Sequence, residues 1–373
     1  MIDAVCEAVT ARFGPDAPPV RSGIVLGSSQ SERLKVVLLL FDVTGTAVAV
    51  AKVARGSAGE HALHAERDVL AAVWATGAPA VVSCAPRLLG LDTIAGRAVL
   101  LTTALDGDPM VTSYFAPGHV SQPDVVRRDF EAASAWLLAF QHQTRGPAVA
   151  ASDALGSWSR SLRRSWGELI GQTDEDEAHF DEIDARVAAV EGTLPMVAVH
   201  GDYWMGNLLT ERGMVLGVLD WEFGAARGLP FRDVYKFPTS YGSYLDRVWA
   251  GRPSVPGHPE RAEIVRRFGL ADGWANAAGM AYTWFGRSWF PSLVARYVER
   301  VSAPLGISHE VHALAFPLFV AEQALALDDD EFRIGYRSVF RSVRAHAADA
   351  WFAVPPPASD RPREPNTDRV PRL

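Results

Sequence analysis

The stretch from Met196 to Phe223, MVAVHGDYWMGNLLTERGMVLGVLDWEF, decides the fold of this chain. It reads as a strand, a loop, a second strand, a hairpin turn at 211–213 and a third strand. Asp202 and Asn207 lie five residues apart in the loop, and Asp220 closes the last strand. Phosphoryl transfer from ATP requires a divalent cation and a carboxylate that faces the acceptor, and Mg²⁺ prefers oxygen ligands. The spacing therefore predicts Asp202 at the acceptor hydroxyl and Asn207 and Asp220 at the metal.

The region before this stretch predicts an antiparallel sheet with one helix. From Val20 to Val53, strand-like runs alternate with turn residues and describe a three-stranded meander with a Gly/Ser turn after its first strand. A helix is expected over roughly Gly59 to Ala75, and two more strands over 86–92 and 97–103. Gly107 and Pro109 then interrupt the pattern. We therefore expect residues 1–105 to form an N-terminal nucleotide-binding lobe.

The remainder is mainly helical. Apolar residues at helical spacing mark one face of a segment that contains Val126, Phe130, Ala133, Leu137 and Phe140. Further helices are expected over 157–170 and 179–190. We assign residues 106–353 to a C-terminal catalytic and acceptor-binding lobe, and the proline-rich polar residues 354–373 to a disordered tail. The predicted fold class is α+β, with an antiparallel-sheet lobe followed by a mainly helical lobe.

Lysine is rare in this chain. Of its 36 basic residues only Lys35, Lys52 and Lys236 are lysine. Lys52 ends a strand-like run, and a compact ammonium suits a buried contact with the α- and β-phosphates better than a forked guanidinium does. Glu66, on the following helix, is its natural ion-pair partner.

Two further segments are candidates for contacts with the nucleotide. The turn that contains Gly27, Ser28 and Ser29 would cover the phosphates, because glycine permits close approach of the backbone. The residues before Gly107 resemble the hinge that joins the two lobes of a kinase, and this likeness implies that the backbone of Thr103 and Leu105 would contact the adenine edge.

These motifs together resemble the aminoglycoside phosphotransferase family. His200-Gly201-Asp202 followed by Asn207 is similar to the family's H-G-D-x-x-x-x-N segment, and Leu219-Asp220-Trp221 to its I-D-W/F segment. Residues 228–233 are similar to its G-D-P-x-x-D segment, although Leu229 replaces the acid. Choline kinases have a related aspartate-led segment, so this part does not separate the two branches. The resemblance covers roughly residues 20–240.

The resemblance implies a protein-kinase-like bilobal fold and an enzyme that uses ATP and Mg²⁺. It implies that Asp202 is the catalytic carboxylate, that Asn207 and Asp220 bind metal, that His200 supports the loop, and that Asp233 braces it. The implied acceptor is a small-molecule hydroxyl, of an aminoglycoside, another glycosylated antibiotic or an amino sugar. The alternatives are a choline-like or homoserine-like alcohol kinase, or a nucleotide-binding pseudokinase. A protein kinase is disfavoured because no A-P-E-like stretch follows Asp220.

Composition excludes several other classes. A net charge of −8 argues against a nucleic-acid binder, which needs basic surface. Cys6 and Cys84 have no neighbouring histidine at metal-ligand spacing, so neither a zinc site nor a disulfide framework is suggested. The N-terminus lacks the basic and apolar regions of a signal peptide, and no apolar run is long enough to span a bilayer. We expect a cytoplasmic protein, monomeric or homodimeric, without membrane or nucleic-acid partners.

Overall fold

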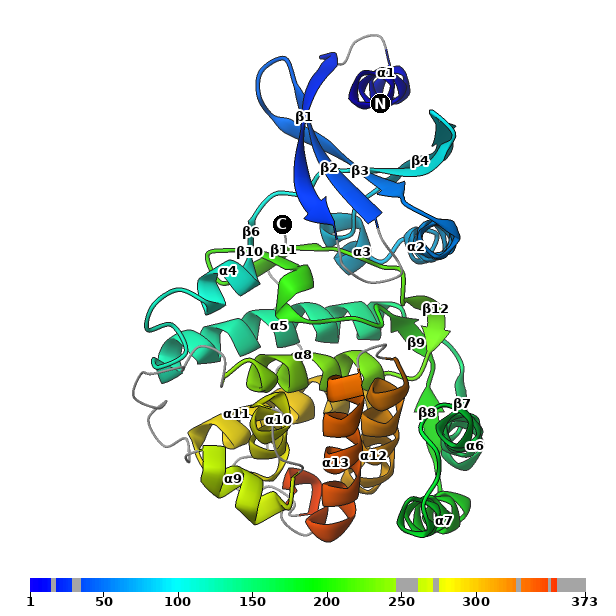
Figure 1. Cartoon of the computed structure of the whole chain (residues 1–373), viewed down its shortest axis with the longest axis vertical. Coiled ribbons are helices and arrows are strands. Elements are labelled where there is room, and N and C mark those ends of the chain that lie inside the picture. The colour runs from blue at the N-terminus through cyan, green and yellow to red at the C-terminus, as the bar shows by residue number, and fades with distance from the viewer. Residues whose placement is uncertain are drawn as a thin grey trace, which may run out of the picture.

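An antiparallel sheet forms the N-terminal part of the molecule, as the computed structural model shows in Figure 1. The structure describes residues 1–14, 18–28, 35–245, 261–270, 275–326, 330–347 and 350–353. The sheet has the order β1-β2-β3-β5-β4, and every neighbouring pair is antiparallel. Its strands are β1 (Val20–Ser28), β2 (Lys35–Asp42), β3 (Ala47–Ala54), β4 (Leu88–Ile94) and β5 (Arg97–Thr103). The five predicted strands are confirmed, with β4 shifted two residues toward the C-terminus.

Because side chains alternate along the strands, the two faces of this sheet pack against different helices. On β3, Ala49, Ala51 and Val53 pack in one apolar cluster with Val5 and Val9 of helix α1 (Ile2–Phe13). Residues of the opposite parity face helix α2 (Ser57–Trp74), and Leu63 of this helix packs against Leu100 of β5. Because successive strand residues point to opposite faces, Lys52 lies on the α2 side.

The rest of the chain is mainly helical, which confirms the predicted fold class. Helix α5 (Pro123–Gln143) runs below the sheet region, with α8 (Phe231–Ser243) beneath it (Figure 1). All five predicted apolar positions of α5 are buried. Within the described residues, no helix is long and apolar enough to cross a membrane. The other helices of six or more residues are α3 (Pro79–Cys84), α6 (Ala151–Leu169), α7 (Asp174–Ala189), α9 (Arg261–Phe268), α10 (Ala275–Phe285), α11 (Trp289–Ser302), α12 (His309–Ala326) and α13 (Asp330–Ala345).

Short strands set into this helical part carry the stretch that began the sequence analysis. β9 (Val197–Val199) leads into the loop with Asp202, and the hairpin of β10 (Leu208–Glu211) and β11 (Met214–Val218) follows. Arg212 and Gly213 both have positive φ, 50° and 77°, as a tight hairpin turn requires. β6 (Asp108–Pro109) pairs with β10, and β12 (Ala225–Gly228) pairs with β9. The predicted strand, loop and hairpin are confirmed.

Short elements complete the described chain. They are α4 (Met110–Tyr114), β7 (Ala148–Ala150), β8 (Thr193–Pro195) and the 3-10 turns Met205–Asn207, Ala303–Leu305 and Trp351–Ala353. The pair β7·β8 joins the start of α6 to the segment that enters β9. The proposed tail, 354–373, lies outside the described residues.

Candidate active site

Lys52 joins the sheet to the hairpin through two carboxylates. Its Nζ lies 2.6 Å and 2.8 Å from the two carboxylate oxygens of Glu66 and 2.7 Å from Oδ1 of Asp220. Glu66 is buried on α2, while the side chain of Asp220, two residues after β11, keeps 37% of its surface exposed. The ion pair predicted from the sequence is present, and it extends to the predicted metal ligand.

A second lysine meets the same aspartate. Lys35, the first residue of β2, places Nζ 3.3 Å from Oδ1 of Asp220 and 2.6 Å from Oε2 of Glu222. The backbone of Asp220 has a φ of 66°, in the left-handed region that non-glycine residues seldom adopt. Such strain persists only where surrounding contacts impose it, and here it directs the Asp220 carboxylate to both lysines.

The charges of this cluster favour the ionised forms of Lys52 and Asp220 but not that of Glu222. Although burial opposes the charged forms, Glu66 and Asp220 raise the pKa of Lys52, and the two lysines hold the pKa of Asp220 well below its ordinary range. Burial and the neighbouring Asp220 raise the pKa of Glu222. Asp220 is therefore ionised at neutral pH.

Asp202 is held by both of its carboxylate oxygens. The Nδ2 of Asn207 donates to Oδ2 at 3.1 Å and to the backbone oxygen of Asp202 at 2.9 Å. The Nζ of Lys236, on α8, lies 3.0 Å from Oδ1. A carboxylate held at both oxygens has a fixed orientation, which a group that receives an acceptor hydroxyl needs.

The buried Asp233 fixes the backbone that carries Asp202. Its two carboxylate oxygens accept hydrogen bonds from the backbone N–H groups of His200 and Gly201, both at 2.7 Å. The Nε2 of His200 lies 2.8 Å from the Leu219 carbonyl and its Nδ1 accepts from Asp202 N–H at 3.3 Å, so a neutral ring protonated on Nε2 satisfies both contacts. Asp233 and His200 thus occupy the bracing positions that the sequence assigned to them.

Gly201 is required in this loop. Its φ is 84°, and a Cβ at this position would stand 2.0 Å from the carbonyl oxygen of Phe223. Any side chain would therefore push apart the two segments that carry Asp202 and Asp220.

The residues present fit a divalent cation. Asp220 supplies an ionised carboxylate, and the Asn207 amide is oriented through its nitrogen, which leaves Oδ1 without a hydrogen bond among the described residues. These are hard oxygen donors of the kind that Mg²⁺ prefers. No group of three or more His, Cys, Asp and Glu side chains arranged for a metal occurs in the described part of the chain. The remaining ligands would come from water and phosphate, as is usual for Mg²⁺.

The predicted phosphate-covering turn differs from the structure at two of its three residues. Gly27 and Ser28 are the last residues of β1, paired with Val37 and Val36 of β2, because the strand pairing continues to the end of the predicted turn. Ser29 lies outside the described residues.

The backbone of the two predicted hinge residues has different surroundings. The N–H of Thr103 donates to the Arg87 carbonyl at 2.9 Å, so this group is occupied within the sheet. Leu105 lies against β11, where a Cβ on Gly217 would come within 3.2 Å of Leu105 Cβ.

Three residues of the site were missed from the sequence: Lys35, Glu222 and Lys236. The signal for the two lysines was present, because all three lysines of the chain meet the carboxylates of this site. Glu222 gave no such signal, since it is one of 44 acidic residues.

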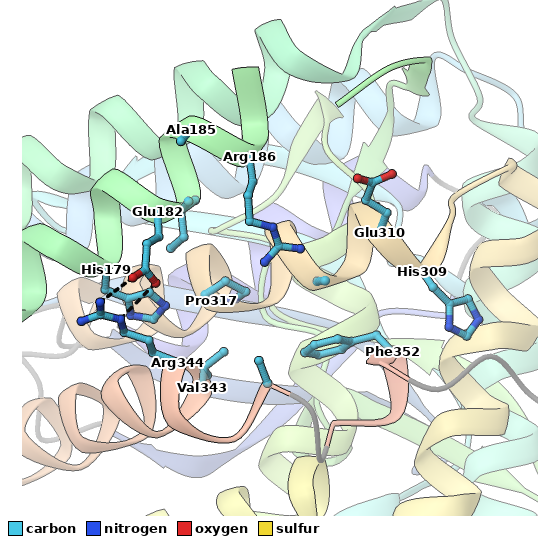
Figure 2. Close-up of a pocket in the computed structure, with 13 residues that line it drawn as sticks. His179, Glu182, Ala185, Arg186, His309, Glu310, Pro317, Val343, Arg344 and Phe352 are labelled. Atoms are coloured by element: carbon cyan, nitrogen blue, oxygen red, sulfur yellow. Dashed lines mark hydrogen bonds and ion pairs between the residues drawn. The ribbon is translucent and has the colours of Figure 1, made fainter. Parts of the chain in front are cut away.

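A separate cavity of about 830 Å³ lies among α7, α12 and α13. Figure 2 shows Arg186 extending from α7 toward Pro317 of α12, while Arg344 of α13 meets Glu182. None of the residues predicted for phosphoryl transfer lines it. The lining residues are His179, Glu182, Ile183, Ala185, Arg186, His309, Glu310, Ala313, Pro317, Val343, Arg344, Ala347 and Phe352.

His179, at the edge of this cavity, predicts a loss of stability in acid. The side chain is buried against Phe340, with ring centroids 4.3 Å apart, and its Nδ1 has no partner in the described residues. Burial, followed by Arg344, lowers its pKa to about 4. Between pH 6.5 and 4 the unfolded chain binds a proton that the folded chain does not, so stability falls as the pH decreases.

His179→Phe should remove this part of the acid sensitivity while it keeps an aromatic ring against Phe340. The loss of unfolding free energy between pH 7.5 and pH 5, measured by urea denaturation, is expected to be about 2 kcal/mol smaller than in the wild type. His64→Phe, a change at an exposed position on α2, is the matched control. Identical pH dependence of wild type and His179→Phe would contradict this account.

Comparison with known proteins identifies related sequences and folds. The model of the phosphotransferase enzyme family matches residues 38–280. No curated protein matches the chain significantly. A thermostable aminoglycoside phosphotransferase mutant, solved as a ternary complex with ADP and hygromycin B, matches with a TM-score of 0.53 and 15% identity, over 92% of this chain and 98% of that one. At this identity the match shows a common fold.

Two other solved structures match with TM-scores below 0.5. A macrolide 2'-phosphotransferase from Brachybacterium faecium has a TM-score of 0.42 and 19% identity, over 87% of this chain and 96% of that one. A glucosamine kinase has a TM-score of 0.45 and 16% identity, over 92% of this chain and 98% of that one.

Proposed function

This chain belongs to the phosphotransferase enzyme family and is a small-molecule phosphotransferase, and from that premise we propose that it transfers the γ-phosphoryl group of ATP to a substrate hydroxyl bound beside Asp202. The observation that carries the proposal has two parts. Lys52 binds both Glu66 and Asp220, and the carboxylate of Asp202 is held at both of its oxygens. A pseudokinase is disfavoured because none of these groups has been replaced.

Each of these side chains has a part in the transfer. Lys52, held by Glu66, binds the α- and β-phosphates. Asp202 accepts a hydrogen bond from the acceptor hydroxyl and aims its oxygen at the γ-phosphorus. A bond forms between that oxygen and phosphorus while the bond to the β,γ-bridging oxygen breaks. ADP leaves with the electron pair, and the hydroxyl proton passes to Asp202.

Asp220 and Asn207 would hold Mg²⁺, which neutralises phosphate charge when bound. In the arrangement described above, Oδ1 of Asp220 is shared by Lys52 and Lys35. Lys35 is the partner that can turn elsewhere, because Glu222 still neutralises it at 2.6 Å. Lys35 can thus leave the Asp220 carboxylate to a cation, and its own buried charge remains paired with Glu222.

For the acceptor we propose a glycosylated antibiotic, an aminoglycoside or an amino sugar, whose phosphorylation would serve antibiotic resistance. Trp204, two residues after Asp202, stacks on Tyr244 with ring centroids 6.0 Å apart, and Tyr244 meets the edge of Phe115 at 6.1 Å. Flat aromatic faces suit the apolar face of a sugar ring. The solved complex of the same fold with ADP and hygromycin B supports this choice and the use of ATP. A choline-like or homoserine-like alcohol is the alternative.

A coupled assay of ADP release tests the proposal. Purified protein with Mg-ATP is offered aminoglycosides, macrolides, amino sugars and amino alcohols in turn. We expect ADP release that depends on one sugar-containing class and disappears in Asp202→Asn. Release with choline or homoserine alone would support the alternative acceptor, while absence of both turnover and Mg-ATP binding would overturn the proposed function.

A further inference from the structure

Lys236 is a lysine that no nucleotide-binding motif accounts for, and it lies at Asp202 rather than at Asp220. It projects from the middle of α8 to the loop of Asp202, where its Nζ lies 3.0 Å from Oδ1 of Asp202 and 2.9 Å from Oε1 of Gln323 on α12. Although burial opposes its charged form, Asp202 raises the pKa of Lys236 above the ordinary lysine value. The side chain is therefore a permanent cation beside the proposed catalytic carboxylate.

The contacts of Lys236 leave one donor unassigned. An ammonium group has three N–H donors, and Asp202 and Gln323 account for two of them. No third hydrogen bond joins it to the described residues, although the phenol groups of Tyr244 and Tyr336 are also close enough to influence its charge. Because the Nζ contacts Oδ1 of Asp202 while Asn207 holds Oδ2, the remaining donor belongs to a group that lies directly beside the proposed catalytic carboxylate.

A neighbouring ion pair shows what a purely structural cation looks like on this helix. One turn earlier on α8, Arg232 binds Glu322 of α12 through two nitrogens. Glu322 directly precedes the Gln323 that contacts Lys236. Arginine suits such a tie because its planar fork matches a carboxylate. On α8, lysine stands where the cation meets Asp202, and an ammonium can hold one oxygen while it offers another donor elsewhere.

We propose that Lys236 is a further catalytic residue, whose third N–H donates to an oxygen of the transferring γ-phosphoryl group while its other contacts keep Asp202 aligned. This inference rests on the proposed function. Negative charge on the phosphoryl oxygens needs a fixed donor in the transition state, and Lys236 supplies one from helix α8, whereas Lys52 is on the sheet. Lys236 keeps its proton throughout, so it changes neither the atom nor the charge balance of the transfer. Gln323 is its positioning residue.

Nucleotide binding tests this role without knowledge of the acceptor. Calorimetric titration with Mg-ADP and with the non-hydrolysable Mg-AMP-PNP compares wild type, Lys236→Met and Arg232→Met. Lys236→Met should weaken AMP-PNP binding by about tenfold or more, the usual effect of a lost hydrogen bond to a charged group, and leave ADP binding within about twofold. Arg232→Met, which also removes one positive charge from α8, should preserve the wild-type ratio of the two affinities.

The outcomes separate this inference from the function on which it rests. If wild type and Lys236→Met each bind both nucleotides with the same ratio of AMP-PNP affinity to ADP affinity, the role of Lys236 is overturned. The proposed function is then unaffected. Failure of the wild type to bind either nucleotide would overturn both. If Arg232→Met changes the ratio of AMP-PNP affinity to ADP affinity as much as Lys236→Met does, both residues would be assigned to helix packing. If Lys236→Met does not fold, Lys236→Gln, which keeps an N–H toward Asp202, gives the same comparison.

Discussion

Asp202→Asn is expected to lower kcat by about 10²- to 10⁴-fold, the range of a lost general base or hydroxyl-orienting carboxylate. Asparagine keeps the size of the side chain, but it removes the negative charge that accepts the hydroxyl proton. It also leaves the Lys236 ammonium, 3.0 Å from Oδ1, without a charged partner. Because Lys52 and Asp220 are untouched, the affinity for Mg-ATP should stay close to that of the wild type.

The measurement is single-turnover transfer from ATP to the acceptor found in the ADP-release assay, combined with calorimetric titration of nucleotide. Asp124→Asn, at an exposed aspartate on α5, is the matched control and should turn over like the wild type. Full turnover by Asp202→Asn would remove the carboxylate from the chemistry. Loss of nucleotide binding along with turnover would indicate instead that the loop had rearranged.

Asp220→Asn should produce the second large loss, about 10³-fold or more in kcat/KM, because several kcal/mol of charge stabilisation depend on the bound cation. The change removes the charge shared by Lys52 and Lys35, whose Nζ atoms lie 2.7 Å and 3.3 Å from Oδ1. Unlike Asp202→Asn, it should also abolish the Mg²⁺ dependence of ATP binding.

Titrations of ATP with and without Mg²⁺ distinguish the two variants. Wild type and Asp202→Asn should bind ATP more tightly when Mg²⁺ is present, whereas Asp220→Asn should bind it equally in both conditions. Retention of the Mg²⁺ dependence by Asp220→Asn would mean that the cation is held by other groups. Thermal melting of both proteins controls for unfolding, since the left-handed backbone of residue 220 tolerates asparagine as well as aspartate.

The parts of the site that could be predicted from the sequence are set by local geometry. Asp202, Asn207 and Asp220 occupy one loop and one hairpin, so their spacing and turn chemistry were enough to bring them near one another. Lys52 and Glu66 are 14 residues apart, on a strand and the helix that follows it. Strand alternation and helix periodicity placed them on facing surfaces without any long-range information.

The missed residues depend on how distant segments pack. Lys35 reaches Asp220 across 185 positions, and Lys236 reaches Gln323 across 87, so no local pattern links them. The rarity of lysine pointed to both. Which acid each lysine contacts depends on how the sheet packs against the hairpin and on which face of α8 is turned toward the loop of Asp202. The predicted turn at Gly27 and Ser28 is a strand for a related reason, since pairing with β2 continues β1 through both residues.

The confinement of every lysine to one place also shapes the covalent chemistry of this protein. Acylating and alkylating reagents that select primary amines, and enzymes that acetylate or methylate lysine, find side-chain targets only at Lys35, Lys52 and Lys236. All three ammonium groups are held in ion pairs around Asp202 and Asp220. Arginine supplies the other side-chain cations, and it does not react with these reagents. Apart from the amino terminus, amine-directed labelling therefore either spares the protein or modifies its proposed active site.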